Sequence, residues 1–230
     1  MDILMQNQNN KVSKDCYYCN NSTIKYGYTK GGNQRRKCQT CKRTQVTTYH
    51  YKAYHRNTDK SIILLTKEGL GIRSIARVLQ ISSTTLLKRL LQIADTIPRP
   101  AIPKHKIYEV DELCTYIKKK SRQIWVVYAL DRTTKAVVSF TVGTRTSATL
   151  NTVTKTLLYA KAKAIHTDRL KQYATLIPSN IHHKKQFGTN HIERYNLSLR
   201  THLKRLTRRS ICFSKSKAML FAILKIYFWS

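Results

Sequence analysis

The spacing of apolar residues predicts two kinds of structure along this chain. Between residues 58 and 96, apolar side chains recur at steps of three and four, as in GIRSIARVLQ, which predicts short helices. Farther on, IYEVD (107–111), IWVVYALD (124–131) and AVVSFTV (136–142) are rich in β-branched and aromatic residues and predict strands. The short RTTK connection between the last two predicts a hairpin, so a helical segment is followed by a mixed segment.

The rest of the mixed segment alternates helices with one more strand. Residues 147–160 and 189–206 carry apolar side chains at helical spacing, and KAIHTD (163–168) predicts a short strand between them. The apolar tail AMLFAILKIYFW is too short to span a membrane and is interrupted by Lys225, so it predicts a core helix. The resulting order is β–β–β–α–β–α.

The helical segment has the layout of a helix-turn-helix. A first helix from about 59 to 68 ends at Gly69, a short second helix follows, and the third begins after the turn at Ile81, where Ser82 or Ser83 can cap it. A plain three-helix packing unit is the alternative. The residues that the third helix would present to a DNA groove are Ser83, Thr84, Thr85, Lys88 and Arg89.

Two CxxC pairs lie near the N-terminus. Cys16 and Cys19 are separated from Cys38 and Cys41 by 18 residues, a spacing typical of one tetrahedral zinc ion held by four thiolates. The intervening Gly, Thr and Tyr residues fit a β-ribbon, whereas free or redox-active thiols are the alternative. Whether the ribbon contacts DNA or protein stays open. The basic residues that favour DNA are Arg35, Arg36, Lys37, Lys42 and Arg43.

Proline placement divides the chain. Three of its four prolines lie in PRPAIP (98–103), which predicts a linker. We therefore expect an α+β multidomain protein with a zinc ribbon at 1–57, a helix-turn-helix at 58–97, a linker at 98–104 and an α/β catalytic domain at 105–230.

Net charge narrows the class of partner. The chain has 43 Lys and Arg against 11 Asp and Glu, a formal net charge of +32. Such charge repels itself in the folded state and favours a polyanion, and nucleic acid fits because each phosphate contact releases counterions. A membrane ranks lower because the basic residues are spread over every segment. The absence of a signal-peptide pattern and the cysteine spacing indicate a reducing compartment.

Carboxylates are scarce in the last 99 residues, which hold 19 Lys and Arg but only Asp168 and Glu193. Asp111 closes one predicted strand, Asp168 closes another, and Glu193 lies on the helix that follows. This order describes a ribonuclease-H-like arrangement, in which two acids end neighbouring strands and a third faces them from a helix. Such a trio predicts a site for two divalent ions, Mg²⁺ or Mn²⁺, that acts on nucleic-acid phosphates. Taken singly, each acid could instead form a salt bridge or a solvated charge.

Neighbouring charged residues receive other roles. Strand alternation places Glu112 on the face opposite Asp111, so Glu112 is not expected to be a direct ligand. Glu109 shares the face of Asp111 two residues away, and Asp131 is expected to cap the RTTK turn. The basic residues expected to contact DNA near the acids are Lys184, Lys185, Arg200, Lys204, Arg205, Arg208 and Arg209.

Several of these segments resemble a known family. VDELCTYIKKKSRQIWVVYALD, HTDRLKQY and HIERYNLSLRTHLKRL are similar to the catalytic part of the insertion-sequence-one family of bacterial transposases. CYYCN, CQTC and IRSIARVLQIS resemble its zinc-finger and helix-turn-helix part, so the resemblance covers nearly the whole chain. It implies a ribonuclease-H-like DDE transposase that uses Mg²⁺, with the acidic triad at Asp111, Asp168 and Glu193 and the downstream basic residue at Arg200.

The expected function is DNA transposition. The N-terminal modules would bind the terminal inverted repeats of an insertion sequence, and the catalytic domain would free the 3′ ends and join them to target DNA. Paired ends would require a homodimer or higher homo-oligomer, working in the bacterial cytoplasm on the nucleoid. The alternatives are a nuclease without strand transfer and a zinc-dependent DNA-binding regulator.

Overall fold

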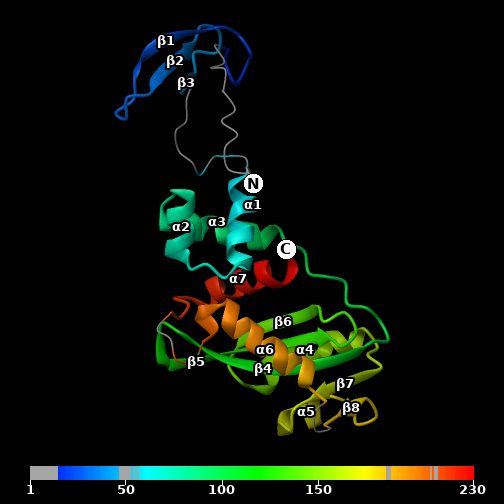
Figure 1. Ribbon diagram of the computed structural model, residues 1–230. Coiled ribbons are helices and arrows are strands. Elements are labelled where there is room, and N and C mark those ends of the chain that lie inside the picture. The colour runs from blue at the N-terminus through cyan, green and yellow to red at the C-terminus, as the bar shows by residue number, and fades with distance from the viewer. Residues whose placement is uncertain are drawn as a thin grey trace, which may run out of the picture. The chain divides into compact units, whose positions relative to one another are not determined.

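A computed structural model describes residues 15–46, 53, 55, 57–184, 188–207, 209 and 212–230. The chain divides into two compact units, Met1–His55 and Arg56–Ser230, which are described separately (Figure 1). The described residues form two sheets and seven α-helices, a mixed α/β architecture. In the same part of the chain, no helix has both the length and the apolar character needed to span a bilayer.

The first unit contains a three-stranded antiparallel sheet. Its strands, in sheet order, are β1 (Thr23–Tyr28), β2 (Gln34–Cys38) and β3 (Thr44–Val46). Buried Gln45 ties the sheet to the first cysteine turn, because its side-chain oxygen accepts from Tyr17 N at 2.9 Å and its amide donates to the Asp15 carbonyl at 2.8 Å. The strands predicted between the two cysteine pairs are therefore present.

Three short helices open the second unit. They are α1 (Thr58–Lys67), α2 (Ile72–Leu79) and α3 (Ser83–Thr96). Gln80 ends α2 in the left-handed region at φ 52°, and Ser82 caps α3 by accepting from Thr85 N at 3.0 Å. The predicted helices and the Ser82 cap are confirmed.

A five-stranded sheet follows, with the order β6-β5-β4-β7-β8. The strands β4, β5 and β6 pair antiparallel, whereas β7 runs parallel to β4 and β8 runs parallel to β7. Their bounds are β4 Ile107–Ile117, β5 Lys119–Asp131, β6 Val137–Gly143, β7 Ala164–Thr167 and β8 His182–His183.

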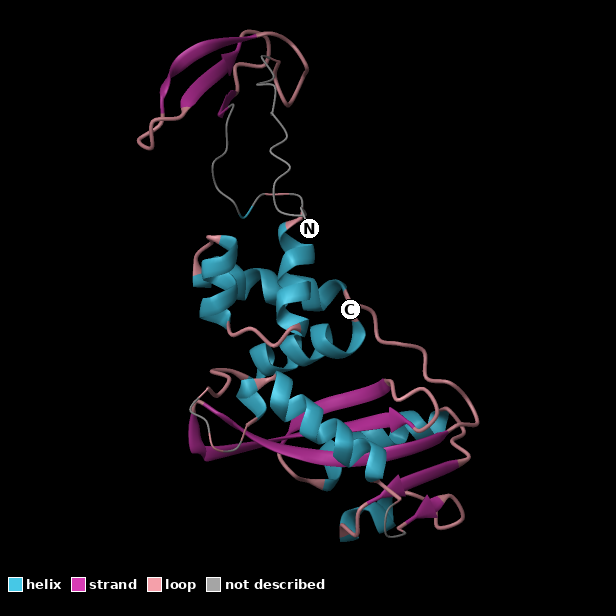
Figure 2. Ribbon diagram, in the orientation of Figure 1, coloured by secondary structure: helices cyan, strands magenta, loops and turns pink. Residues whose placement is uncertain are grey.

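Helices cover both faces of this sheet (Figure 2). One core places Leu113 and Tyr128 of the sheet against α6 and α7, and the other places Tyr108 and Val127 against α4 and α5. The burial of alternate strand residues on opposite faces is what a sheet packed on both sides requires. The helices are α4 Ser147–Tyr159, α5 Lys171–Leu176, α6 Asn190–His202 and α7 Lys217–Trp229, with a 3-10 turn at Lys204–Leu206.

Helix α7 joins the helical segment to the sheet. It packs against α1 and α3 on one side and β6 on the other, and Figure 1 shows it between them. Lys67 Nζ donates to the Ser230 carbonyl at 2.6 Å. Gly69, at φ 75°, passes so close to the end of α6 that a Cβ there would lie 2.1 Å from the His202 carbonyl oxygen. Residues 58–97 and 105–230 thus lie in one compact unit.

Three element boundaries differ from the sequence prediction, one of them the start of β5, which lies at Lys119 and not at Ile124. The strand expected to close at Asp111 continues to Ile117, because the long β4–β5 hairpin keeps both strands paired up to the turn at Lys118. The helix expected over 189–206 ends at His202, and a 3-10 turn then carries Leu206 into the core. The extension of β4 buries Leu113 and Cys114, which the sequence prediction did not include, whereas Leu206 is buried as its spacing predicts but by a 3-10 turn.

Candidate functional site

The parallel pairing of β4 and β7 brings two predicted acids together. Val110 of β4 lies opposite Thr167 of β7, and the next residues along the two strands are Asp111 and Asp168. Oxygen atoms of Asp111, Glu112 and Asp168 lie within 4.8 Å of one another. These three carboxylates are called the acidic group below. Carboxylate oxygens are donors that Mg²⁺ and Mn²⁺ prefer, so the acidic group is a possible site for such an ion.

Glu112 joins the acidic group from the other face of the sheet. Asp111 accepts a 2.6 Å hydrogen bond from Asn196 of α6, whereas Glu112 accepts from the Tyr173 hydroxyl of α5. The two side chains thus meet helices on opposite faces, as alternation predicts, but the expectation that Glu112 stands apart from the metal ligands does not agree with its place in the acidic group. Because β7 ends at Thr167, β4 has no neighbouring strand on its β7 side at Glu112. The carboxylates from the two faces approach each other around this open edge of β4.

Negative charge is concentrated in the acidic group. Burial raises the pKa of Asp111 to about 7, and the charges of Glu112 and Asp168 add to the rise, while hydrogen bonds from Glu112 N and Asn196 oppose it. Burial, together with the Asp168 charge, also raises the pKa of Glu112. A bound cation would relieve this repulsion between the carboxylates. Both the charge of the acidic group and its oxygen donors therefore fit a divalent metal ion.

Arg145 contacts two of these acids. Its Nη2 donates to Glu112 Oε2 at 2.9 Å and lies 4.0 Å from Asp168 Oδ2. Its guanidinium carbon stands 4.5 Å from the centre of the Trp125 ring. Sequence reasoning missed Arg145, which lies in the loop between β6 and α4, because no motif marks it.

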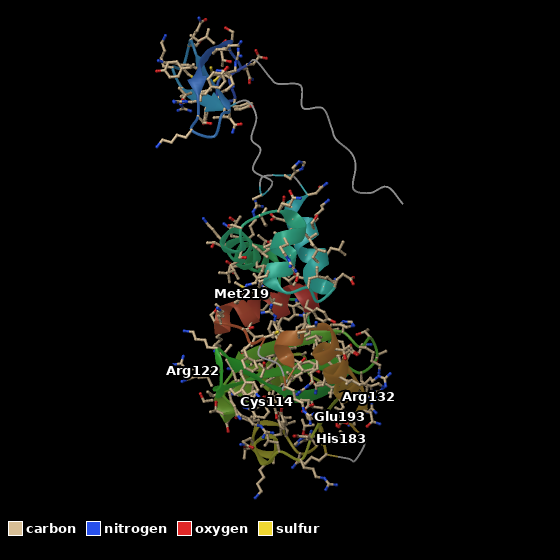
Figure 3. All side chains as sticks on the ribbon, turned by 60° about the vertical axis from the view of Figure 1, so that its left-hand side comes forward. Cys114, Arg122, Arg132, His183, Glu193 and Met219 are labelled. Atoms are coloured by element: carbon tan, nitrogen blue, oxygen red, sulfur yellow. The ribbon has the colours of Figure 1, made fainter. Side chains whose placement is uncertain are left out.

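Glu193, the third predicted acid, is not a member of the acidic group. It lies exposed in the first turn of α6, where its Oε1 accepts from Thr189 Oγ1 at 2.8 Å (Figure 3). One turn later, Asn196 donates to Asp111 and accepts from the Tyr128 hydroxyl at 2.9 Å. The structure therefore brings together two of the three predicted acids and adds an amide that orients one of them.

Glu109 fixes the position of α6 relative to β4. Its side chain is fully buried, and its Oε2 accepts from Ile192 N in the first helical turn at 2.9 Å. Its Oε1 accepts from His191 Nδ1 at 2.6 Å and lies 3.4 Å from Arg132 Nε. A carboxylate is favoured at this end of a helix, where free N–H groups point outward. The only sequence signal for this role was that Glu109 shares the strand face of Asp111.

Asp131 has the role that its turn predicts. Its Oδ1 accepts from Thr133 N at 2.7 Å and from Thr134 N at 3.2 Å, so the prediction that it caps the RTTK turn is confirmed.

The four cysteines of the first unit also converge. Their sulfur atoms lie within 4.8 Å of one another, with 3.5 Å between Cys16 and Cys41 and 3.5 Å between Cys19 and Cys38. The hydrogen bond from Cys41 N lowers the pKa of Cys38 to about 6, which favours the thiolate that a metal needs. Four thiols this close suit one tetrahedral ion, so the set is a possible zinc site.

Basic side chains near the cysteines divide into exposed and engaged residues. Lys42 and Arg43 are exposed, and the Arg43 guanidinium lies 4.6 Å from the Tyr18 ring centre. Arg36 instead donates from Nε to Thr23 Oγ1 at 2.7 Å, which commits it to the ribbon. The remaining two, Arg35 and Lys37, lie over the ring of Tyr26 at 5.6 and 5.0 Å.

Helix α3 presents part of its predicted DNA-facing set. Ser83, Thr84 and Lys88 are exposed, whereas half-buried Thr85 bonds to the Ser82 cap and Arg89 donates to Asp59 at 2.7 Å. An open groove beside the turn between α2 and α3 is lined by Arg73, Arg77 and Ser83, among others. Sequence reasoning missed these two arginines, although their four-residue spacing places them on one side of a helix.

The predicted basic residues around α6 are placed differently from one another. Lys184, Lys204 and Arg209 are exposed, and Arg200 is half-buried on α6. Arg205 turns inward to Ser214 Oγ at 3.0 Å, and burial lowers its pKa to about 10. The Arg205 side chain therefore points into the protein, whereas the predicted DNA contact would need it to point outward. Two further residues, Lys185 and Arg208, lie outside the described residues.

Comparisons with known proteins give one family. Residues 106–228 match the family described as IS1 transposase. The insertion element IS1 4 protein InsB of Escherichia coli (strain K12) is 43% identical over 108 residues, which are 47% of this chain and 65% of that protein. The insertion element iso-IS1n protein InsB of Shigella dysenteriae is 36% identical over 110 residues, 48% of this chain and 84% of that protein. The match thus spans just under two thirds of the Escherichia coli relative.

One solved structure is similar over much of its length. It is a chain from the cryoEM structure of the simian T-cell lymphotropic virus intasome in complex with PP2A regulatory subunit B56 gamma. The TM-score is 0.36 at 19% identity, covering 71% of this chain and 66% of that chain. A TM-score this low does not establish a shared fold.

Proposed function

Because the chain belongs to the IS1 transposase family, we propose that it is a DNA transposase that frees the 3′ ends of an insertion sequence and joins them to target DNA. The observation that carries the proposal is the parallel register of β4 and β7, which brings Asp111 and Asp168 together in a chain of net charge +32. A carboxylate pair within a cationic protein suits a cation-assisted reaction of a polyanion.

The proposed fold of the catalytic part is ribonuclease-H-like. The sheet order supports it, since three antiparallel strands are followed by two parallel ones, with the first strand at the centre. Helices on both faces of the sheet support it further. In this proposed arrangement Asp111 lies on β4, Asp168 directly follows β7, and the third acid of the family pattern, Glu193, lies in the first turn of α6, which Glu109 of β4 contacts at Ile192 N.

The proposed ligands of Mg²⁺ or Mn²⁺, two ions per active site, are Asp111, Asp168 and Glu193. When bound, such ions would activate the attacking oxygen and stabilise charge on the phosphate. The protein's own part is orientation. Asn196 holds the Asp111 carboxylate from α6, and Glu109 fixes the turn of α6 that carries Glu193. Residues that orient a ligand in this way tune metal sites strongly.

The proposed zinc site consists of Cys16, Cys19, Cys38 and Cys41, with one structural Zn²⁺. The short sulfur–sulfur distances and the small core around these cysteines support it. Among the described residues of the first unit few apolar side chains are buried, so an ion bound there would contribute much of its folding free energy.

The proposed DNA-binding surfaces are the exposed basic and hydroxyl residues of the ribbon, of α3 and of the region around α6. The inverted-repeat ends would contact the first two, and the exposed residues Lys184, Lys204 and Arg209 would contact DNA near the acidic group. Joining two ends requires at least a homodimer, and the excess positive charge supports a place on the bacterial nucleoid.

The test is a strand-transfer assay with pre-cut ends, plasmid target and Mg²⁺ or Mn²⁺. Asp111→Asn and Asp168→Asn should each abolish joined product, whereas the exposed acid Asp95, changed to Asn, serves as a matched control and should join normally. Cleaved ends without joined product would support the nuclease. DNA binding with neither product would support the regulator, and normal joining by Asp111→Asn would refute the proposed site.

A further inference from the structure

Three elements hold Arg145 beside the acidic group. Its guanidinium donates to Glu112 of β4, lies 4.0 Å from Asp168 after β7, and stacks on Trp125 of β5. The Arg145 side chain remains 36% exposed. Within the described part of the chain, Nη1 of Arg145 makes no hydrogen bond, whereas Nε and Nη2 both reach Glu112.

Glu112 is fully engaged as the anchor of this arginine. Its Oε2 accepts from Nε and Nη2 of Arg145 at 3.3 and 2.9 Å, and its Oε1 accepts from the Tyr173 hydroxyl. The Glu112 side chain is 1% exposed. A buried carboxylate whose two oxygens accept from Arg145 and Tyr173 is suited to fixing a cation, so Glu112 holds the arginine, whereas Asp111 and Asp168 are the proposed metal ligands.

The loop that carries Arg145 is fixed at both ends. At Gly143 the backbone passes so near α4 that a Cβ would lie 2.7 Å from Thr149 Oγ1. Thr146 then caps α4 by accepting from Thr149 N at 3.4 Å. Stacking on Trp125 further restricts the guanidinium plane. Arg145 is therefore held ready before any ligand arrives.

We propose that Arg145 binds the phosphodiester that is cut or joined, next to the ion held by Asp111 and Asp168. This inference rests on the proposed function. A guanidinium presents paired N–H donors that match phosphate oxygens, and its delocalised charge persists at all working pH values. At 4.0 Å from Asp168, Arg145 balances that carboxylate in the free protein. An ion bound to Asp168 takes over this balance, and the exposed donors of Arg145 remain available for DNA.

Two readouts separate phosphate binding from a structural role. Arg145→Gln removes a positive charge next to the proposed ion, so Mn²⁺ should bind the DNA-free protein at least as tightly as it binds the wild type in a calorimetric titration. With saturating Mn²⁺, strand transfer should fall about 100-fold, the size of effect seen when one donor to a developing charge is lost. Arg145→Lys keeps the charge without the paired donors and should retain intermediate activity.

The matched control is Arg122→Gln. Arg122 is an exposed arginine of β5 and projects away from Glu193 in Figure 3. It should leave Mn²⁺ affinity and strand transfer unchanged. Parallel loss of Mn²⁺ binding and activity in Arg145→Gln would assign a structural role and overturn the proposal. Strand transfer within threefold of the wild type would also overturn it.

A binding experiment tests Arg145 without turnover. A pre-cut end with a 3′-dideoxy terminus cannot be joined, so its affinity can be measured against salt concentration in Mn²⁺. Arg145→Gln should lower the slope of log affinity against log salt by about 0.9, the loss of one phosphate contact, and Arg145→Lys should not. An unchanged slope in Arg145→Gln refutes the phosphate contact. If the wild type binds ends with an Arg145-dependent slope yet yields no joined product, the proposed function fails while this inference stands.

Discussion

The cysteine site and the acidic group are built in opposite ways. All four cysteines lie on turns and strand ends within 26 residues, and their spacing alone predicts that they meet. The acidic group depends on the register of β4 with β7, whose acids are 57 positions apart, and its supports come from α5, α6 and the loop before α4. A site whose residues are close in the sequence forms once a local turn brings them together, whereas a site built from distant elements forms only when the whole domain folds.

The largest expected effect tests whether the cysteine site folds independently of the Arg56–Ser230 unit. Cys38→Ser removes one of four thiolates, so the first unit should lose its zinc and its sheet, because a small core cannot replace the ion. Metal analysis should find no zinc, and the thermal unfolding of the Arg56–Ser230 unit should be unchanged. Exposed Cys212, changed to Ser, should keep one zinc per chain. Destabilisation of both units by Cys38→Ser would break the contrast.

The next effect tests the acidic group through Glu109, the buried carboxylate that positions α6 beside it. Glu109→Ala leaves Arg132 and the Ile192 N–H without their buried carboxylate and should lower the free energy of unfolding by about 3 kcal/mol. Urea unfolding of the Arg56–Ser230 unit measures this change. Exposed Glu68, changed to Ala, should cost less than about 0.5 kcal/mol. Equal stabilities would show that α6 does not depend on Glu109.

A smaller effect should appear when only the orientation of a ligand is lost. Asn196→Ala removes the amide that joins Asp111 to the Tyr128 hydroxyl and should lower strand transfer about 10- to 100-fold, without the loss of fold expected for Glu109→Ala. The rate at saturating Mn²⁺ and the urea midpoint separate the two outcomes. Ser198→Ala, two residues along α6, should leave the rate unchanged. Full activity of Asn196→Ala would mean that Asp111 needs no support.

The smallest effects concern two neighbours on α3. Lys88 is exposed and Arg89 is paired with Asp59, although the sequence assigned both to DNA. Lys88→Ala should lower the salt slope of DNA binding by about 0.9. Arg89→Ala should leave that slope unchanged and cost less than about 1 kcal/mol of stability, as half-exposed ion pairs do. Filter binding at several salt concentrations measures the slopes, and a lower slope in Arg89→Ala would restore its predicted DNA contact.

Sequence patterns predicted the helices and strands more accurately than they predicted the contacts between side chains. The bounds of α1 and α4 agree closely with those expected from apolar spacing, and the start of α3 agrees with the Ser82 cap, because these signals are local. Asp168 could be chosen because acids are scarce in the last 99 residues, and Asp111 because it closes a predicted strand. The engagement of Arg145, Asn196 and Glu109 could not be predicted, since each depends on which strands and helices meet. Strand alternation gave the faces of Asp111 and Glu112 correctly, but it could not tell that β7 ends beside them.

The packing of α7 against α1 and α3 has a consequence for how elements of this kind diverge. The surface that holds the helix-turn-helix-like segment in place is encoded at the far end of the chain, more than 100 residues away. A recombination event that exchanged residues 58–97 alone would leave α7 packed against a surface that does not match it. It would also place a new side chain against the His202 carbonyl unless the incoming segment had glycine at position 69. Under the proposed function, changes in which DNA ends are bound are therefore expected to accumulate as substitutions on the exposed side of α3, not as exchanges of the whole segment.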